Sequence, residues 1–363
     1  MHPAKKRRHA MLLLTKACCM LAVVALLFSF LSCKRGSDVP LSPGLSTIRG
    51  EPVYDSDVAM QTDHFTVTPG MMAFFFYGYG GEIMVEMEKN MAYDGTKSLH
   101  DQIYADGLSW YDVLMNSTLQ KVSEMLIYCE AAKEAGVTLT DAQRAAVAED
   151  ITSLRVDAAS LGLELDSYLQ RLYGPLMTEA DLQVVYEYEA LAAVYSATVI
   201  TELEQGITKA QADAYATANG LTDGTLSRNI AYAAVPYVAS KPNETELARI
   251  SQAMQVSPTA ETLQGFASIA SVGSVENLTP DNTGVRAIAD WLYDSARSVG
   301  DWGRVETEAA TYILIYTGNG MRFAEVTARM RLYDAAYADW YNGWVERLQF
   351  GYNYDILDGY DVA

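Results

Sequence analysis

The sequence has 363 residues, half of them hydrophobic, and it carries 46 acidic against 26 basic side chains, a formal charge of −20 at neutral pH. A nucleic-acid partner is disfavoured, because neutralising phosphates requires clustered lysine and arginine. The length is enough for one or two domains with a sizeable core.

The first thirty-three residues have the pattern of an export signal. Lys5–Arg8 form a basic start, and Ala17–Phe30 supplies an apolar run. The run ends in Leu31-Ser32-Cys33, which resembles the bacterial lipoprotein signal, although Phe30 replaces the more usual aliphatic residue. In that family the cysteine is lipidated and becomes the mature N-terminus, so the resemblance implies lipidation of Cys33. The alternative is an uncleaved membrane anchor, for which the run is short.

Both alternatives place the rest of the chain outside the cytoplasm, tethered to a bacterial cell membrane. Residues 34–363 hold 21 basic and 46 acidic side chains, a formal charge of −25. Such a surface disfavours adsorption to anionic lipid, so the lipid on Cys33 has to provide the anchor; the acidity also serves plain solubility. After Cys33 only Cys129 remains, which excludes an intramolecular disulfide in the mature protein.

Residues 34–62 are rich in Ser, Pro, Gly and Asp and are predicted to be a flexible linker. A short strand at His64–Val67 and a helix start at Thr68-Pro69 follow. The helix is expected to end at Gly78, and it is apolar nearly all round. It is therefore either core or a groove that grips apolar peptides. The tentative peptide-binding residues are Met71, Met72, Phe74, Phe75, Phe76 and Tyr77.

The next part of the chain is predicted to be almost entirely helical. Apolar spacing and helix-capping signals predict helices over residues 117–135, from 140 onward, 166–173, 178–203 and 208–219. Residues 322–350 form another long helix with an aromatic stripe that includes Tyr337, Trp340 and Trp344. This stripe is expected to complete the core of the helical block, with a ligand-binding face as the alternative. The acidic end, 351–363, is expected to be frayed.

The chain changes character at about residue 223. A strand is predicted at Arg228–Pro236, helices at 243–254, 258–270 and 288–297, and a final strand at Thr311–Tyr316. Strand, helices and strand over so short a span indicate a small α+β module.

Together these motifs resemble the SurA/PrsA family of extracytoplasmic foldases. The features that carry the resemblance are the Thr68-Pro69 helix, the Trp110 entry, the run Glu130-Ala-Ala-Lys-Glu-Ala-Gly136 and the run Tyr168-Leu-Gln-Arg-Leu-Tyr-Gly174. The resemblance implies a mainly α fold: a SurA/trigger-factor-like helical peptide-binding domain over 63–222, completed by the C-terminal helix, 319–350. A parvulin-like module over 223–318 would be inserted into it.

The catalytic pattern of active parvulins is absent from this module. Those enzymes carry one His on the first strand and another on the last, whereas this sequence has only His2, His9, His64 and His100. The corresponding positions hold Ile230 or Ala231, and Tyr312 or Ile313. An Asp of the parvulin site could only be Asp281, Asp290 or Asp294, and the sequence places none of them.

No other catalytic site is indicated. Without Cys or His in the second half, a nucleophilic triad cannot form across the fold, and His64 and His100 lack the spacing of a zinc site. We therefore expect no catalytic residues, no metal and no cofactor.

The expected function is that of a membrane-anchored chaperone for unfolded or nascent exported proteins, with a parvulin-like module lacking strong prolyl isomerase activity. Three alternatives stay open: an active isomerase with a rewired site, the solute-binding lipoprotein of a transporter, and a cell-envelope assembly scaffold.

Overall fold

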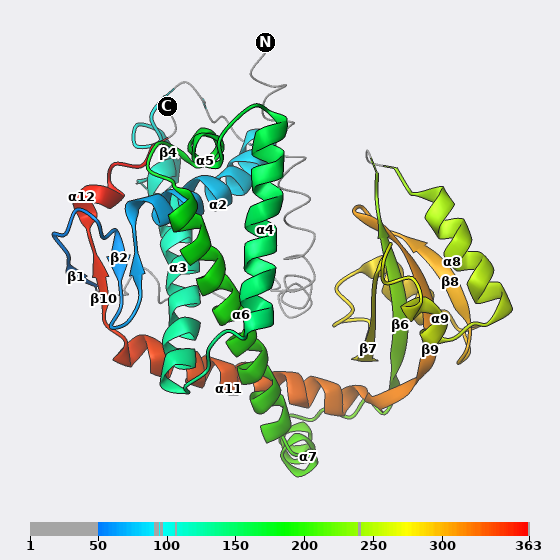
Figure 1. The fold of residues 1–363 in the computed structure, drawn as a ribbon. Coiled ribbons are helices and arrows are strands. Elements are labelled where there is room, and N and C mark those ends of the chain that lie inside the picture. The colour runs from blue at the N-terminus through cyan, green and yellow to red at the C-terminus, as the bar shows by residue number, and fades with distance from the viewer. Residues whose placement is uncertain (1–49, 91–93, 95–96, 106, 239–240, 362–363) are drawn as a thin grey trace. The chain divides into compact units, whose positions relative to one another are not determined.

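The computed structural model describes residues 50–90, 94, 97–105, 107–238 and 241–361 (Figure 1). The predicted signal, Cys33 and the first part of the predicted linker lie outside these residues. The described chain forms two compact units. We call residues 50–202 and 337–361 the helical unit, and residues 203–336 the insert unit.

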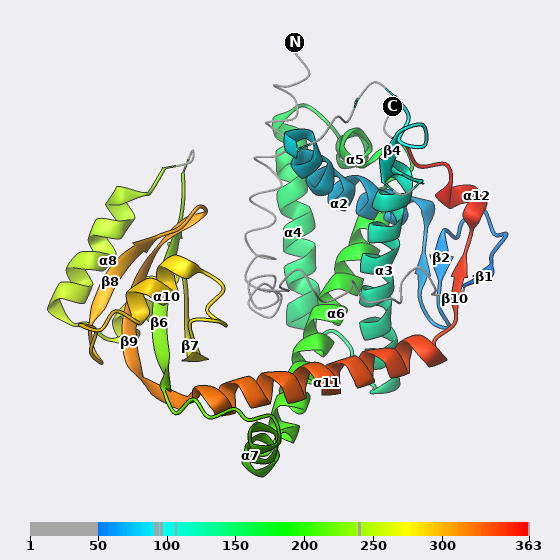
Figure 2. The ribbon, with the colours of Figure 1, turned by 180° about the vertical axis from the view of Figure 1, so that it is seen from behind.

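The helical unit is built mainly from helices, which Figure 1 and, from behind, Figure 2 show. These are α2 (Pro69–Asn90), α3 (Trp110–Glu134), α4 (Asp141–Ser160), α5 (Leu165–Tyr173), α6 (Glu179–Gly206) and α11 (Phe323–Arg347). The last two continue into the insert unit. The predicted mainly α class, with an inserted α+β module, is confirmed.

Local signals explain where these helices begin. The predicted capping box at Thr140 is present: its hydroxyl accepts from the Gln143 amide at 3.3 Å, and Gln143 Oε1 accepts from the Thr140 amide at 2.8 Å. Ser109 caps α3 in the same way with Asp112.

The predicted end of the first helix at Gly78 is wrong, because α2 continues to Asn90. A side chain at Gly78 would meet Tyr173 of α5, and one at Gly80 would meet Leu114 of α3, both at 3.8 Å. Close packing against these helices therefore overrides the weak helix propensity of glycine.

A small sheet joins the two ends of the described chain. Its strand order is β1 (Gly50–Pro52), β10 (Phe350–Tyr352), β2 (Met60–Gln61) and β3 (Thr66–Val67). The predicted linker therefore ends too late, since ordered strands begin by Gly50, and Val58, Ala59 and Met60 are buried.

The prediction of a frayed tail is also wrong. Phe350, Tyr352 and Tyr360 are buried, and the short helix α12 (Tyr354–Leu357) follows the strand. The apolar area of these rings outweighs the acidic residues between them. The helical unit also contains the hairpin of β4 (Ile103–Ala105) and β5 (Leu108–Ser109).

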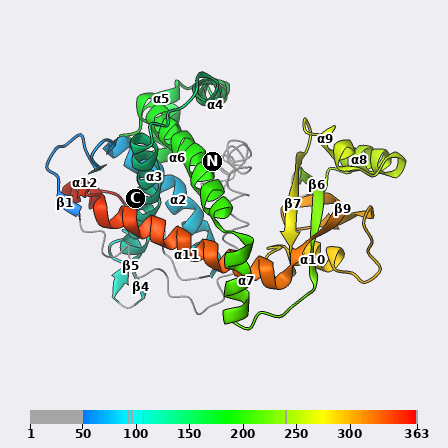
Figure 3. The ribbon, with the colours of Figure 1, turned by 90° about the horizontal axis from the view of Figure 1, so that it is seen from below.

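The insert unit is an antiparallel four-stranded sheet with helices on both faces. The strand order is β7 (Ser271–Leu278), β6 (Leu226–Pro236), β9 (Ala310–Arg322) and β8 (Trp302–Glu306). Helices α8 (Glu244–Val256) and α9 (Ala260–Gln264) cover one face, and α10 (Arg286–Leu292) covers the other (Figure 3). Strands β7 and β8, at the two edges, were not predicted.

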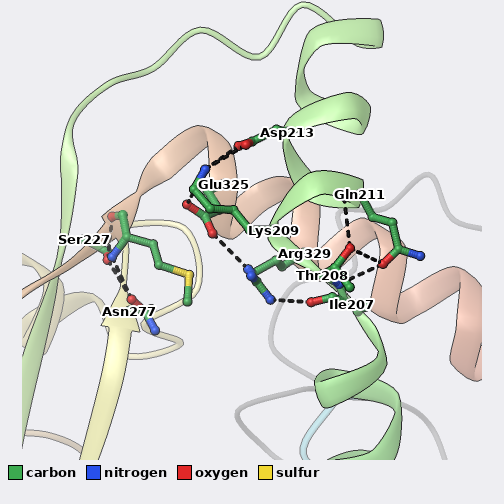
Figure 4. Close-up of polar contacts among 10 residues, drawn as sticks. Ile207, Thr208, Lys209, Gln211, Asp213, Ser227, Asn277, Glu325 and Arg329 are labelled. Atoms are coloured by element: carbon green, nitrogen blue, oxygen red, sulfur yellow. Dashed lines mark hydrogen bonds and ion pairs between the residues drawn. The ribbon is translucent and has the colours of Figure 1, made fainter.

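The base of the insert unit is held by polar contacts beside α7 (Lys209–Ala218) (Figure 4). Arg329 of α11 donates to the Ile207 carbonyl oxygen at 2.8 Å and pairs with Glu325 at 3.2 Å. Ser227 Oγ donates to the Met321 carbonyl oxygen at 2.8 Å, joining the start of β6 to the end of β9. These contacts fix where the chain enters and leaves the sheet.

In the part of the chain that the structure describes, none of the helices combines the length and apolar character needed to cross a bilayer.

Candidate functional sites

The six tentative peptide-binding residues all lie on α2, and the structure places four of them in the core. Met71, Met72, Phe75 and Phe76 are each at most 1% exposed, whereas Phe74 and Tyr77 are partly exposed. A peptide cannot reach the four buried side chains in this conformation. The core alternative holds for them because no residue between Met71 and Tyr77 is polar enough to face water.

Segments distant in sequence cover these side chains. Phe74 packs on Tyr173 of α5, with ring centroids 4.8 Å apart. Phe76 packs on Tyr360, with centroids 5.6 Å apart, and the Tyr360 hydroxyl donates to the Pro69 carbonyl oxygen at 2.7 Å. The C-terminal residues thus close over α2.

The aromatic stripe on α11 is less covered. We call Tyr128, Tyr337, Trp340 and Trp344 the aromatic ladder: Trp340 lies 5.2 Å from Tyr128, 6.0 Å from Tyr337 and 6.4 Å from Trp344, centroid to centroid. The Tyr128 and Tyr337 hydroxyls are 2.9 Å apart and hydrogen-bonded. Tyr128 and Trp344 are buried, but Tyr337 and Trp340 keep part of their rings exposed. The ladder therefore presents two partly exposed rings, those of Tyr337 and Trp340, on the helical unit.

In the insert unit, the alternation of β-strand side chains decides which residues share a site. Ile230 and Tyr232 of β6, and Tyr312 and Leu314 of β9, point to the α10 face. Ala231 and Ile313 point to the opposite face and pack beneath α8 and α9. Of the residues that the sequence offered in place of the parvulin histidines, Ile230 and Tyr312 therefore share one face.

A cavity of about 10 Å³ lies on that face. Ile230, Tyr232, Tyr312 and Leu314 line it together with Thr283 and Ile288. Such a volume holds about one water molecule and leaves no room for a proline ring. An open apolar pocket between Ile230 and Ile313, which an active isomerase would need, does not form because these two residues lie on opposite faces.

The acid–base chemistry of the cavity is limited to two phenols. Burial raises the pKa of Tyr232. Burial, and then the neighbouring Tyr232, raise the pKa of Tyr312. Both groups stay protonated at neutral pH and can only donate or accept a hydrogen bond. Asp281, Asp290 and Asp294 are all exposed and none lines the cavity.

Sequence reasoning missed Tyr232, Thr283 and Leu314 as cavity residues. Strict two-residue alternation from Ile230 and Tyr312 would have found Tyr232 and Leu314. Thr283 follows β7, a strand that the sequence did not predict, so no signal pointed to it.

Among the described residues, no three His, Cys, Asp or Glu side chains come together to hold a metal ion.

No family model matches the sequence, and no curated protein does. Among solved structures, the chain is similar to PrsA from Bacillus subtilis, with 10% identity and a TM-score of 0.30, covering 69% of this chain and 86% of that one. It is also similar to a SurA-like chaperone of Campylobacter jejuni, with 9% identity and a TM-score of 0.26, covering 81% and 98%. A third match is the foldase PrsA from Streptococcus pneumoniae, with 13% identity and a TM-score of 0.23, covering 68% and 89%.

All three belong to the group that the sequence motifs resemble. Their identities to this chain are 9–13%, and their TM-scores are at most 0.30.

Proposed function

We propose that the protein is an extracytoplasmic chaperone, anchored by a lipid on Cys33, that holds unfolded segments of exported proteins without using ATP. Its insert unit is not a strong prolyl isomerase. The lipoprotein-like signal supports the location and the anchor. The acidic surface keeps a complex with an unfolded client soluble.

The aromatic ladder supports the holding role. Trp340 and Tyr337 offer partly exposed rings on a helix that also carries exposed charges, such as Asp334 and Asp339. Large aromatic rings bury much apolar area with little loss of conformational freedom, and they accept varied apolar partners. The ladder therefore replaces α2 as the surface on which we expect clients to bind.

The cavity in the insert unit supports the second part of the proposal, the absence of strong isomerase activity. It has room for about one water molecule, and the residues offered in place of the parvulin histidines, Ile230 or Ala231 and Tyr312 or Ile313, cannot exchange protons at neutral pH. Substrate proline would have to displace packed side chains before the bond could turn. A slow rate, at best, is expected from this unit.

The ladder is tested with Trp340→Ala in soluble protein comprising residues 34–363. Suppression of the aggregation of an unfolded client is expected to fall clearly while the circular dichroism spectrum is retained. Val156→Ala, at a 64% exposed apolar position of α4, is the matched control. If both variants suppress aggregation as well as the unmodified protein, the ladder is not the client surface.

An isomerase with a rewired site is the second candidate, because Tyr232 and Tyr312 line the cavity and their hydroxyls can donate or accept a hydrogen bond. If this candidate holds, the Tyr232→Phe, Tyr312→Phe double variant loses a measurable isomerisation rate. If the unmodified protein has no such rate, this candidate is excluded.

A further inference from the structure

A larger pocket lies in the helical unit, at the end of the aromatic ladder. It has a volume of about 330 Å³, within the range of sites that bind small ligands or single side chains. Three segments form it: the turn between β2 and β3, the last turn of α3, and the last turn of α11.

Two apolar side chains line the pocket: Trp344 of α11, and Leu348 directly after the end of α11. Both are less than a tenth exposed. The guanidinium of Arg347 lies over the Trp344 ring, 3.7 Å from its centroid, and pairs with Glu134 of α3 at 3.1 Å. The positive charge of Arg347 is therefore balanced within the pocket wall.

Both oxygens of the buried carboxylate at the pocket have hydrogen-bond partners. Glu130 is 4% exposed, and its Oε1 accepts from the Thr62 hydroxyl at 2.6 Å and from the His64 amide at 2.8 Å. Its Oε2 lies 2.7 Å from His64 Nδ1. These contacts hold the β2–β3 turn onto α3 and give the pocket a fixed wall.

Two charged side chains at the rim of the pocket, Asp63 and Lys133, are exposed. Neither forms an ion pair with any residue that the structure describes. Asp63 is negatively charged, and so is the chain as a whole, which carries a formal charge of −25 beyond residue 33. The negative long-range electrostatic field of such a chain attracts cations and repels anions. A partner that approaches the pocket is therefore more often cationic, and it can pair with the Asp63 carboxylate.

We propose, resting on the function proposed above, that this pocket selects peptide segments in which an apolar side chain stands next to a lysine or arginine. The apolar side chain enters the pocket beside the Arg347 guanidinium and packs against the parts of Trp344 and Leu348 that line it. The neighbouring cation pairs with Asp63. The aromatic ladder then offers further apolar contact along α11, so the pocket gives the chaperone a preference for basic, apolar segments of its clients.

The test uses three fluorescent peptides of equal length with the same apolar residues, carrying lysine, glutamine or glutamate at the flanking positions. They are titrated into residues 34–363 and three variants. Asp63→Lys is expected to weaken binding of the lysine peptide by about five-fold, an effect that shrinks at high salt, as for exposed ion pairs. Asp57→Lys makes the same change of charge at an exposed position that does not line the pocket, and it should have a clearly smaller effect. Lys133→Glu should strengthen binding.

Equal weakening by Asp63→Lys and Asp57→Lys would overturn the pocket and leave only a general charge effect. If the glutamate peptide binds more tightly than the lysine peptide, and if Lys133→Glu abolishes this difference, the proposed preference for cations is wrong. Absence of binding of every peptide to the unmodified protein would instead contradict the proposed chaperone function itself.

Discussion

Helices α2 and α11 are both rich in aromatic side chains, but the chain covers the first and leaves the second partly open. Between Met71 and Tyr77, α2 has no charged residue, and four of the six large apolar side chains there are buried. On α11, charged residues such as Arg331, Asp334 and Asp339 are interleaved with the rings and face water. A run of aromatic residues without charges therefore indicates a core segment. A helix in which charged residues alternate with aromatic ones can keep rings at the surface.

The largest effect is expected from deleting residues 350–363. This removes β10, a central strand of the small sheet, together with Tyr360, whose ring covers Phe76. With α2 uncovered, we expect the helical unit to lose cooperative unfolding. Thermal unfolding of residues 34–349 followed by circular dichroism checks this, and an unchanged midpoint would show that α2 does not depend on the tail.

Replacing one ring on each helix by Ala measures how differently the two helices are buried. Phe76→Ala on α2 should lower the free energy of unfolding by about 3–5 kcal/mol, because a fully buried ring leaves a cavity. Trp340→Ala on α11 should cost only about 1–2 kcal/mol, because its ring is partly exposed. Urea titrations give both values. Equal losses would mean that the two aromatic runs are equally buried.

Desolvation of an acidic side chain extends the comparison to α6. Burial raises the pKa of Glu189 on α6 from 4.5 to about 7, partly offset by Lys121 of α3. Between these two values the folded state binds more protons than the unfolded state, so stability falls as the pH rises through this window. Glu189→Gln should therefore stabilise the protein at about pH 8 and change little at about pH 5.

Urea unfolding at several pH values tests this expectation, with Glu187→Gln as a change of the same charge on the same helix. A stabilisation by Glu189→Gln that does not vary with pH would show that the Glu189 carboxyl is not desolvated.

The smallest effect concerns the hydroxyl pair of the aromatic ladder. Tyr128→Phe and Tyr337→Phe should each lower the free energy of unfolding by about 0.5–1.5 kcal/mol, since each removes the same 2.9 Å hydrogen bond. The double variant should cost less than the sum of the two. Strict additivity would mean that the hydroxyls do not interact in solution.

Most helices could be predicted from the sequence, because caps such as Thr140 and the left-handed Gly136 are local signals. The errors arise where distant contacts decide. Gly78 continues a helix because α5 packs against it, and Phe350 joins a sheet whose other strands lie near residue 60.

The candidate sites also combine features that local sequence signals predict with features that only distant contacts determine. The sequence shows that no histidine follows residue 100, but only the strand register shows that Ile230 and Tyr312 share a face while Ile313 lies on the other. The pocket beside Trp344 joins residues from three distant segments, so no local pattern could indicate it.

The most direct test is to measure prolyl isomerisation and suppression of client aggregation on one preparation of residues 34–363. The proposed function predicts that the protein suppresses aggregation and does not measurably speed isomerisation. Rapid isomerisation would contradict it, because the 10 Å³ cavity under α10 would then have to open and turn substrate proline without histidine.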